Sequence, residues 1–181
     1  MISLPLAYTI LALIAYTTSF WYLFMHLMSK RDPNYWFIGL VLGLGLLLHT
    51  GVLYNNMMTP IGINYDVFNL ISFTSGLMLL LSLLFSTFRP VLALNLIGIP
   101  VAATGLILGY AFSRPDQYIE QHSLGLDAHI ILSLSAYAVL LMATIHAILL
   151  WFQDRELREE TKTPFLGQPT SAISGHGIPV I

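Results

Sequence analysis

Long apolar stretches separated by short polar segments make up most of the sequence. Crossing a hydrocarbon core of about 30 Å takes about 20 apolar residues in a helix, and five stretches reach this length. These stretches cover about residues 3–27, 35–54, 67–86, 91–112 and 127–152. The pattern predicts an all-α polytopic transmembrane helical bundle with five spans over residues 1–158, followed by a tail over residues 159–181.

The composition supports a membrane protein and leaves little room for other classes. Hydrophobic residues make up 56% of the 181 residues and charged residues only 9%, whereas soluble domains carry roughly 25% charged residues. The polar segments are short, so there is no space for a soluble catalytic domain, and we expect that the protein is not an enzyme. No basic patch indicates nucleic acid as a partner; the partner expected from composition is the lipid bilayer.

Cysteine is absent, which excludes disulfides, thiolate nucleophiles, thiolate metal ligands and covalent haem attachment through CxxCH. The first apolar stretch contains no Lys or Arg and is too long for a signal-peptide core. We therefore expect it to remain in the protein as the first span.

The basic residues predict the orientation of the spans. One side of the membrane receives six of the seven: Lys30, Arg31, Arg89, Arg155, Arg158 and Lys162. The other side receives only Arg114, in a segment that also carries acidic residues. Cytoplasmic segments carry an excess of Lys and Arg. The N-terminus is therefore predicted outside and the C-terminus inside.

This orientation places the histidines at two levels. At 1.5 Å per residue, His49 lies about 8 Å and His129 about 3 Å below the outer surface. His122 lies in the outer segment between the last two spans, whereas His26 and His146 lie near the inner ends of theirs. His129 and His146 are about 25 Å apart along one helix, so they cannot share a ligand.

An ionisable side chain within a span is costly unless it is neutral, buried against protein and hydrogen-bonded. We interpret His26 and His122 as structural and leave His146 open. For His49 and His129 we favour a function, because two neutral imidazoles on facing helices can hold haem iron axially. Cofactor binding would involve these two residues first, with His146 and His122 as further candidates. Apart from Asp127 at the outer end of the last one, no carboxylate lies within these spans, which argues against a proton-driven transporter.

Small and polar residues predict contacts between helices. Gly39, Gly43 and Gly45 in GLVLGLG offer a small-residue face for close helix packing. Four polar residues near the start of the third stretch predict interhelical hydrogen bonds: Asn69, Ser72, Thr74 and Ser75. The segment YNNMMTPIGINYD between the second and third stretches is expected to be an irregular loop.

DAHIILSLSAYAVLLMATIHAILLWFQDREL resembles the His-x6-Ala-Tyr span of cytochrome c assembly membrane proteins, the haem handlers of the CcsA/CcmC type. The chain is most similar to the YpjD/HemX-like branch, which LLLHTGVLY, GINYDVFNLISFTSGLMLLLSLLF and FRPVLALNLIGIPVAA also resemble. The resemblance covers about residues 1–165. It implies haem binding or handling in the bacterial inner membrane during cytochrome c maturation, with maturation proteins or an apocytochrome as partners.

The resemblance matches His129 to the histidine of that span and Tyr137 to its tyrosine. The two residues lie about 80° apart around a helix, so they are expected to border one pocket. The tryptophan-rich WGxxWxWD segment of the best-known haem handlers is missing here, as it is in the YpjD/HemX-like branch. That family has further spans, whereas residues after about 163 are rich in Gly, Pro and Ser. We therefore hypothesise a truncated or frameshifted member with a disordered cytoplasmic tail.

Two other functions remain open from the sequence. One is a b-type cytochrome-like electron-transfer subunit, in which a haem is retained and cycles with quinol. The other is a membrane scaffold or transporter component whose histidines are structural.

Overall fold

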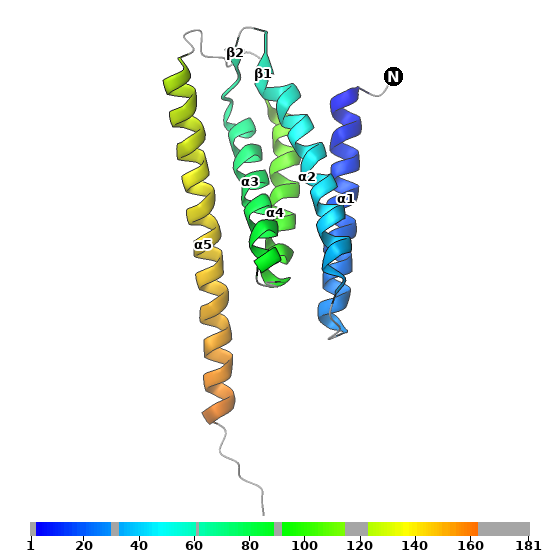
Figure 1. Ribbon diagram of the computed structural model, residues 1–181, viewed down its shortest axis with the longest axis vertical. Coiled ribbons are helices and arrows are strands. Elements are labelled where there is room, and N and C mark those ends of the chain that lie inside the picture. Colours follow the sequence, from blue (N-terminus) through cyan, green and yellow to red (C-terminus); the bar gives the residue numbers. More distant parts are fainter. Residues whose placement is uncertain (1–2, 30–32, 61, 89–91, 115–122, 163–181) are drawn as a thin grey trace, which may run out of the picture. The chain divides into compact units, whose positions relative to one another are not determined.

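The computed structural model describes residues 3–29, 33–60, 62–88, 92–114 and 123–162. Within these residues the chain forms five helices, shown in Figure 1: α1 Leu4–Met28, α2 Tyr35–Met57, α3 Val67–Phe88, α4 Leu92–Phe112 and α5 Leu124–Lys162. All five are long and apolar enough to cross a membrane. The predicted all-α class and its five apolar helices are therefore confirmed, in number and in place.

The last helix differs from the prediction at its C-terminal end. Residues 159–162 were expected in a disordered tail, but α5 continues through them to Lys162. Residues 155–162 contain three Glu, two Arg and one Lys, which are good helix formers, and no helix breaker occurs before Pro164. An ion pair between Arg158 and Asp154, at 2.8 Å and spaced i, i+4, also favours the helix. The rest of the predicted tail, 163–181, lies outside the described residues.

The chain divides into two compact units, Met1–His146 and Ala147–Ile181. This boundary falls within α5. The predicted end of the transmembrane domain at residue 158 stays a prediction. The features below belong to the first unit.

Three helices begin beside a side-chain oxygen that accepts from their free backbone N–H groups. The Asn34 side chain accepts from the first turn of α2, and the Asp66 carboxylate accepts from Phe68 N at 3.0 Å in α3. Ser123 Oγ accepts from Leu126 N at 3.2 Å in α5. These caps satisfy donors that no intrahelical carbonyl can reach, and they define where each helix starts.

A short hairpin joins α2 to α3 where the sequence predicted an irregular loop. Strand β1, Met58–Thr59, pairs antiparallel with strand β2, Gly62–Ile63, and Met58 lies opposite Ile63. Gly62 has a φ of 152°, a conformation that side chains rarely allow, so glycine suits the turn.

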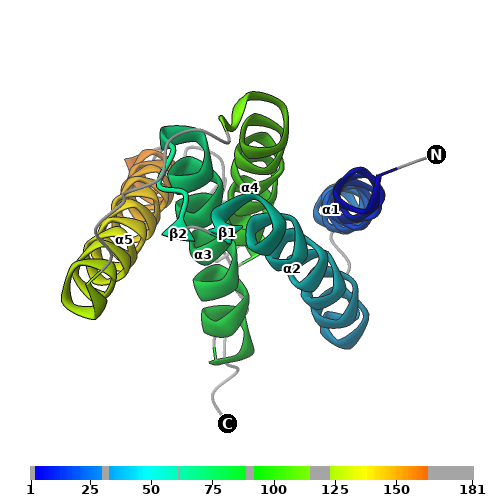
Figure 2. The same cartoon turned by 90° about the horizontal axis from the view of Figure 1, so that it is seen from above.

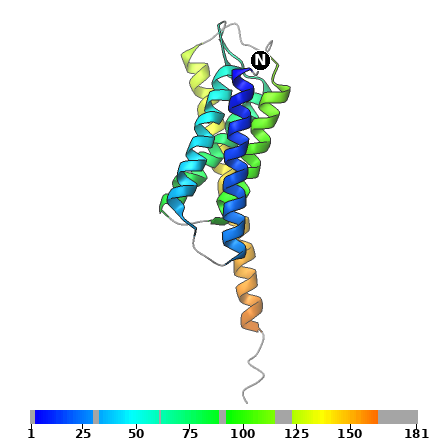
Figure 3. The same ribbon diagram turned by 90° about the vertical axis from the view of Figure 1, so that its right-hand side faces the viewer.

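The core of the first unit lies among α1 to α4. α3 packs most extensively on α4 and α1 on α2, while α1 also contacts α4 and α2 contacts α3. Figures 2 and 3 show α1 alongside α2 in both views. The largest buried apolar side chains of this core include Tyr16, Leu23, Leu42, Leu79 and Leu106.

Only one glycine of GLVLGLG lies in a tight helix contact. A Cβ at Gly45 would lie 2.8 Å from Cε1 of the Tyr16 ring, so α1 and α2 approach closely at this point. Gly39 and Gly43 have no neighbouring atom within 4 Å of such a Cβ. The predicted small-residue contact is therefore confirmed at Gly45 and wrong at the other two positions.

Helix α5 is the least buried of the five. Within its apolar window 11% of residues are buried, compared with 28% to 44% in the other four helices. Met142 packs with Met78 and Leu94 of the first unit. The α5 residues that face the rest of the first unit recur every three or four positions, as one side of a helix does: Asp127, Ile131, Leu134, Ala138 and Met142.

Candidate functional site

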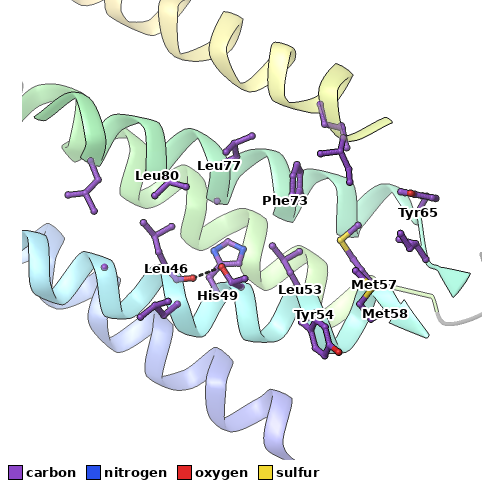
Figure 4. A pocket seen from close by; sticks show the side chains of 18 residues that line it. Leu46, His49, Leu53, Tyr54, Met57, Met58, Tyr65, Phe73, Leu77 and Leu80 are labelled. Atoms are coloured by element: carbon purple, nitrogen blue, oxygen red, sulfur yellow. Dashed lines mark hydrogen bonds between the residues drawn. The ribbon is translucent and has the colours of Figure 1, made fainter. Parts of the chain in front are cut away.

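A cavity of about 480 Å³ lies between α2 and α3 and reaches α5. Figure 4 shows leucines of the two helices facing one another across it, with Met57, Met58 and Tyr65 at the hairpin end. Ile131 and Leu134 contribute the α5 side. Its volume is within the range of small-molecule sites.

His49 forms part of the cavity wall, and both of its ring nitrogens already have partners. Nδ1 lies 3.0 Å from the hydroxyl of Tyr16 on α1, and Nε2 lies 2.9 Å from Oγ of Ser72 on α3. A neutral imidazole has one donor and one acceptor. One hydroxyl therefore donates to the ring and the other accepts from it, and the side chain is only 1% exposed.

The ring of His49 thereby links three helices. It fits because Gly76 has no side chain: a Cβ there would lie 3.2 Å from the ring Cε1. Ser75 Oγ in turn donates to the Ser72 carbonyl at 3.0 Å. This is the environment of a structural histidine, and iron binding at Nε2 would displace Ser72. The predicted ligand role of His49 stays a prediction.

Among the polar residues expected to join helices, only Ser72 has a side-chain bond to another helix, the one to His49. Thr74 donates to the Leu70 carbonyl at 2.8 Å within α3, and Asn69 Nδ2 lies 3.5 Å from the carbonyl of Asn64 before that helix. The prediction is thus confirmed at Ser72.

His129 does not share the cavity with His49. It lies about 200° around α5 from Ile131, which lines the cavity, and its side chain is exposed. Tyr137 is 65% exposed and lies on the same outward side. The expectation that His49 and His129 border one site is therefore not met, because α5 presents its aliphatic side to the bundle. His129 and Tyr137 do share one side of α5, as their spacing predicted.

The remaining histidines differ in their surroundings. His26 bonds through Nδ1 to the carbonyl of Tyr22, at 2.9 Å in its own helix, and its ring lies 4.1 Å from that of Tyr22. This agrees with the structural interpretation. His146 Nδ1 is buried without a hydrogen-bond partner in the described part of the chain. His122 lies outside the described residues.

A polar cluster joins the hairpin to the start of α5. The Tyr65 hydroxyl donates to Asp127 Oδ1 at 2.6 Å. Burial and the adjacent carboxylate raise the pKa of the Tyr65 phenol, so it remains a donor throughout the neutral range. Asn64 is buried and donates through Nδ2 to the Arg114 carbonyl at 2.7 Å. These bonds hold the hairpin over one end of the cavity.

Sequence reasoning missed Tyr16, the partner of His49. A signal was present: Tyr16 lies near the middle of the first apolar stretch, whereas membrane tyrosines are concentrated at the interfaces. A buried hydroxyl at that depth needs a hydrogen-bond partner.

The described residues contain no group of three or more His, Cys, Asp or Glu side chains that could hold a metal ion. Haem requires only one or two axial ligands. Comparisons with family models, with curated proteins and with solved structures each found no match, so any functional assignment rests on the chain's own residues.

Proposed function

We propose that this chain is a multi-pass protein of the bacterial inner membrane that binds haem at His129 and handles it during cytochrome c maturation. The observation that carries the proposal is the exposed imidazole of His129 near the start of α5. Neutral imidazole is the commonest metal ligand in proteins, and an exposed ring offers its nitrogens to a ligand that approaches from outside the bundle. The resemblance of the His129–Tyr137 segment to haem-handling proteins supplies the identity of the ligand.

The residues around His129 suit one face of a porphyrin. Ser133 and Ala136 lie within about 40° of His129 around α5, and their small side chains leave room for a flat ring. Leu132 and Leu140 are 69% and 62% exposed and add apolar contacts. Haem supplies the redox-active iron when bound, while this chain supplies an axial nitrogen and apolar surface. The other face of the porphyrin remains accessible to a partner, such as a maturation protein or an apocytochrome.

Haem titration of the purified protein in lipid nanodiscs tests this role. We expect His129→Ala to weaken haem binding about tenfold or more, or to shift the Soret band, because the axial nitrogen is lost. His26→Ala is the matched control, because His26 is bonded within its own helix. Identical Soret spectra and affinities for wild type and His129→Ala would exclude the axial role.

A second candidate is a membrane scaffold with structural histidines, and the two hydrogen bonds of His49 favour it. It predicts a protein that purifies without pigment and does not bind added haem. A haem that is retained and cycles with quinol would instead indicate a b-type electron-transfer subunit. The visible spectrum separates the scaffold from both haem proteins, and quinol reduction separates the two haem proteins from one another.

We also propose that the N-terminus lies outside and the C-terminus inside. If all five helices cross the membrane, six of the seven basic residues lie on one side of it, and cytoplasmic segments carry this excess. Reporter fusions after Lys162 should read cytoplasmic, and fusions within residues 114–126 should read external. A cytoplasmic signal from the second position would reverse the orientation.

A further inference from the structure

We propose that the cavity between α2 and α3 is a second binding site, separate from His129, and that it holds one hydrocarbon chain of a membrane lipid. The chain can come from two sources, the acyl group of a phospholipid or an isoprenoid tail. Both have the same chemistry along their length, and the experiment below separates them.

The cavity is elongated along the helices. On α2 its lining runs from Gly43 to Met57, which is about 21 Å at 1.5 Å per residue. On α3 it runs from Phe73 to Leu83, which is about 15 Å. A lining that extends about 15 to 21 Å along the helices suits an extended chain better than a disc.

The lining offers a ligand almost no polar contact. None of the residues that line the cavity is charged. Three of the lining residues have polar groups that already form hydrogen bonds within the protein. His49 bonds with Tyr16 and Ser72. The Thr50 hydroxyl bonds with the Leu46 carbonyl at 2.9 Å, and the Tyr65 hydroxyl bonds with Asp127. A buried polar ligand would lose its hydrogen bonds to water without replacement. Hydrocarbon has none to lose.

The same lining argues against haem in this cavity. A porphyrin carries two carboxylates that need cationic or donor partners, and the lining has no Lys or Arg. His49 would first have to release Ser72 to offer a nitrogen. The cavity and His129 are therefore best assigned to different ligands.

The rim of the cavity is open where lipid would lie. Leu47, Leu80 and Ile131 are 72%, 48% and 43% exposed, although all three line the cavity. A chain can therefore enter sideways between the helices. Tyr54 and Tyr65 lie at the hairpin end, where aromatic residues mark the headgroup level. We infer that the polar end of the lipid lies at this end and the chain points toward the bilayer centre.

Two glycines of α2 provide a matched pair of variants. Gly43 lines the cavity and Gly39, one turn earlier, is absent from the lining. A Cβ at either position meets no atom within 4 Å, so both tolerate a larger side chain. Gly43→Phe should occupy one end of the cavity, whereas Gly39→Phe should leave it unchanged. Gly43→Leu should give an intermediate effect.

The experiment uses the full chain in nanodiscs with two photoreactive probes, a phospholipid with a diazirine on its acyl chain and an isoprenoid quinone with a diazirine on its tail. We expect at least one probe to label lining peptides of α2 and α3, such as those with Leu53 and Leu77. Gly43→Phe should lower this labelling about tenfold, and Gly39→Phe should not. The probe that labels identifies the source of the chain, and thermal unfolding confirms that both variants fold.

Three results would overturn the proposal: undiminished labelling of Gly43→Phe, an equal loss in Gly39→Phe, or absence of labelling with both probes. Added haem that abolishes wild-type labelling would assign the cavity to the porphyrin and would also overturn it. Haem binding at His129 is read independently from the Soret band. The two proposals can therefore fail separately.

Discussion

Replacing His49 with alanine is expected to lower the free energy of unfolding by about 2–4 kcal/mol, even in protein that contains no haem. The substitution removes a 1%-exposed ring together with its bonds to Tyr16 and Ser72. Two hydroxyls then remain buried without the partner that each had, and a void remains between three helices. The measurement is thermal or denaturant unfolding in detergent micelles.

Tyr16→Phe and the double variant refine this experiment. Tyr16→Phe removes only the hydroxyl, so its cost should be about 1 kcal/mol and should largely disappear once His49 is alanine. His26→Ala is the control, because His26 bonds only to a carbonyl of its own helix. If His49→Ala has the same free energy of unfolding as wild type, His49 does not stabilise the contact between α1, α2 and α3. That result would favour a ligand role for His49.

The second large effect is expected for Gly105→Leu in α4. A Cβ at Gly105 would overlap Ser75 Oγ and would lie 3.3 Å from the carbonyl oxygen of Ile71. The backbone of α3 cannot move away without losing its packing on α4, which is the most extensive contact between helices. Overpacking of this kind costs about 1–3 kcal/mol, and a branched side chain should reach the upper end.

Gly39→Leu is the matched control, because it makes the same chemical change at a position with no atom within 4 Å. Its stability should stay the same or rise by up to about 1 kcal/mol, since leucine favours a helix more than glycine does. Unfolding of both variants in detergent measures the difference. Equal stabilities would show that α3 and α4 do not depend on close contact at Gly105.

The glycines illustrate how far local sequence information reaches. Gly39 and Gly43 lie on one side of α2 and Gly45 lies about 200° from Gly43, and only Gly45 lies against another helix, at the Tyr16 ring. Which glycine becomes a contact depends on where α1 crosses α2. The crossing point depends on the packing of both helices, so it cannot be predicted from the sequence of one helix alone.

What the sequence determined by itself was the set of helices and the level of each side chain along them. The length of an apolar run is a local quantity, and a helix rises 1.5 Å per residue whatever its neighbours are. The five helices therefore lie where the hydrophobic pattern predicted them, apart from the extension of α5 to Lys162. The position of His49 along α2 and the shared side of His129 and Tyr137 on α5 also follow from this regular geometry.

Only the tertiary structure decided which side of each helix is buried and which partner each polar group contacts. His49 and His129 have comparable predicted depths, but α2 buries the first between Tyr16 and Ser72, and α5 turns the second outward. The rotation of a helix about its own axis depends on how its side chains pack against those of the neighbouring helices. In α5 the packed side is the one that carries Ala138 and Met142. Those neighbours are distant in sequence, so the periodicity of one span cannot distinguish a buried histidine from an exposed one.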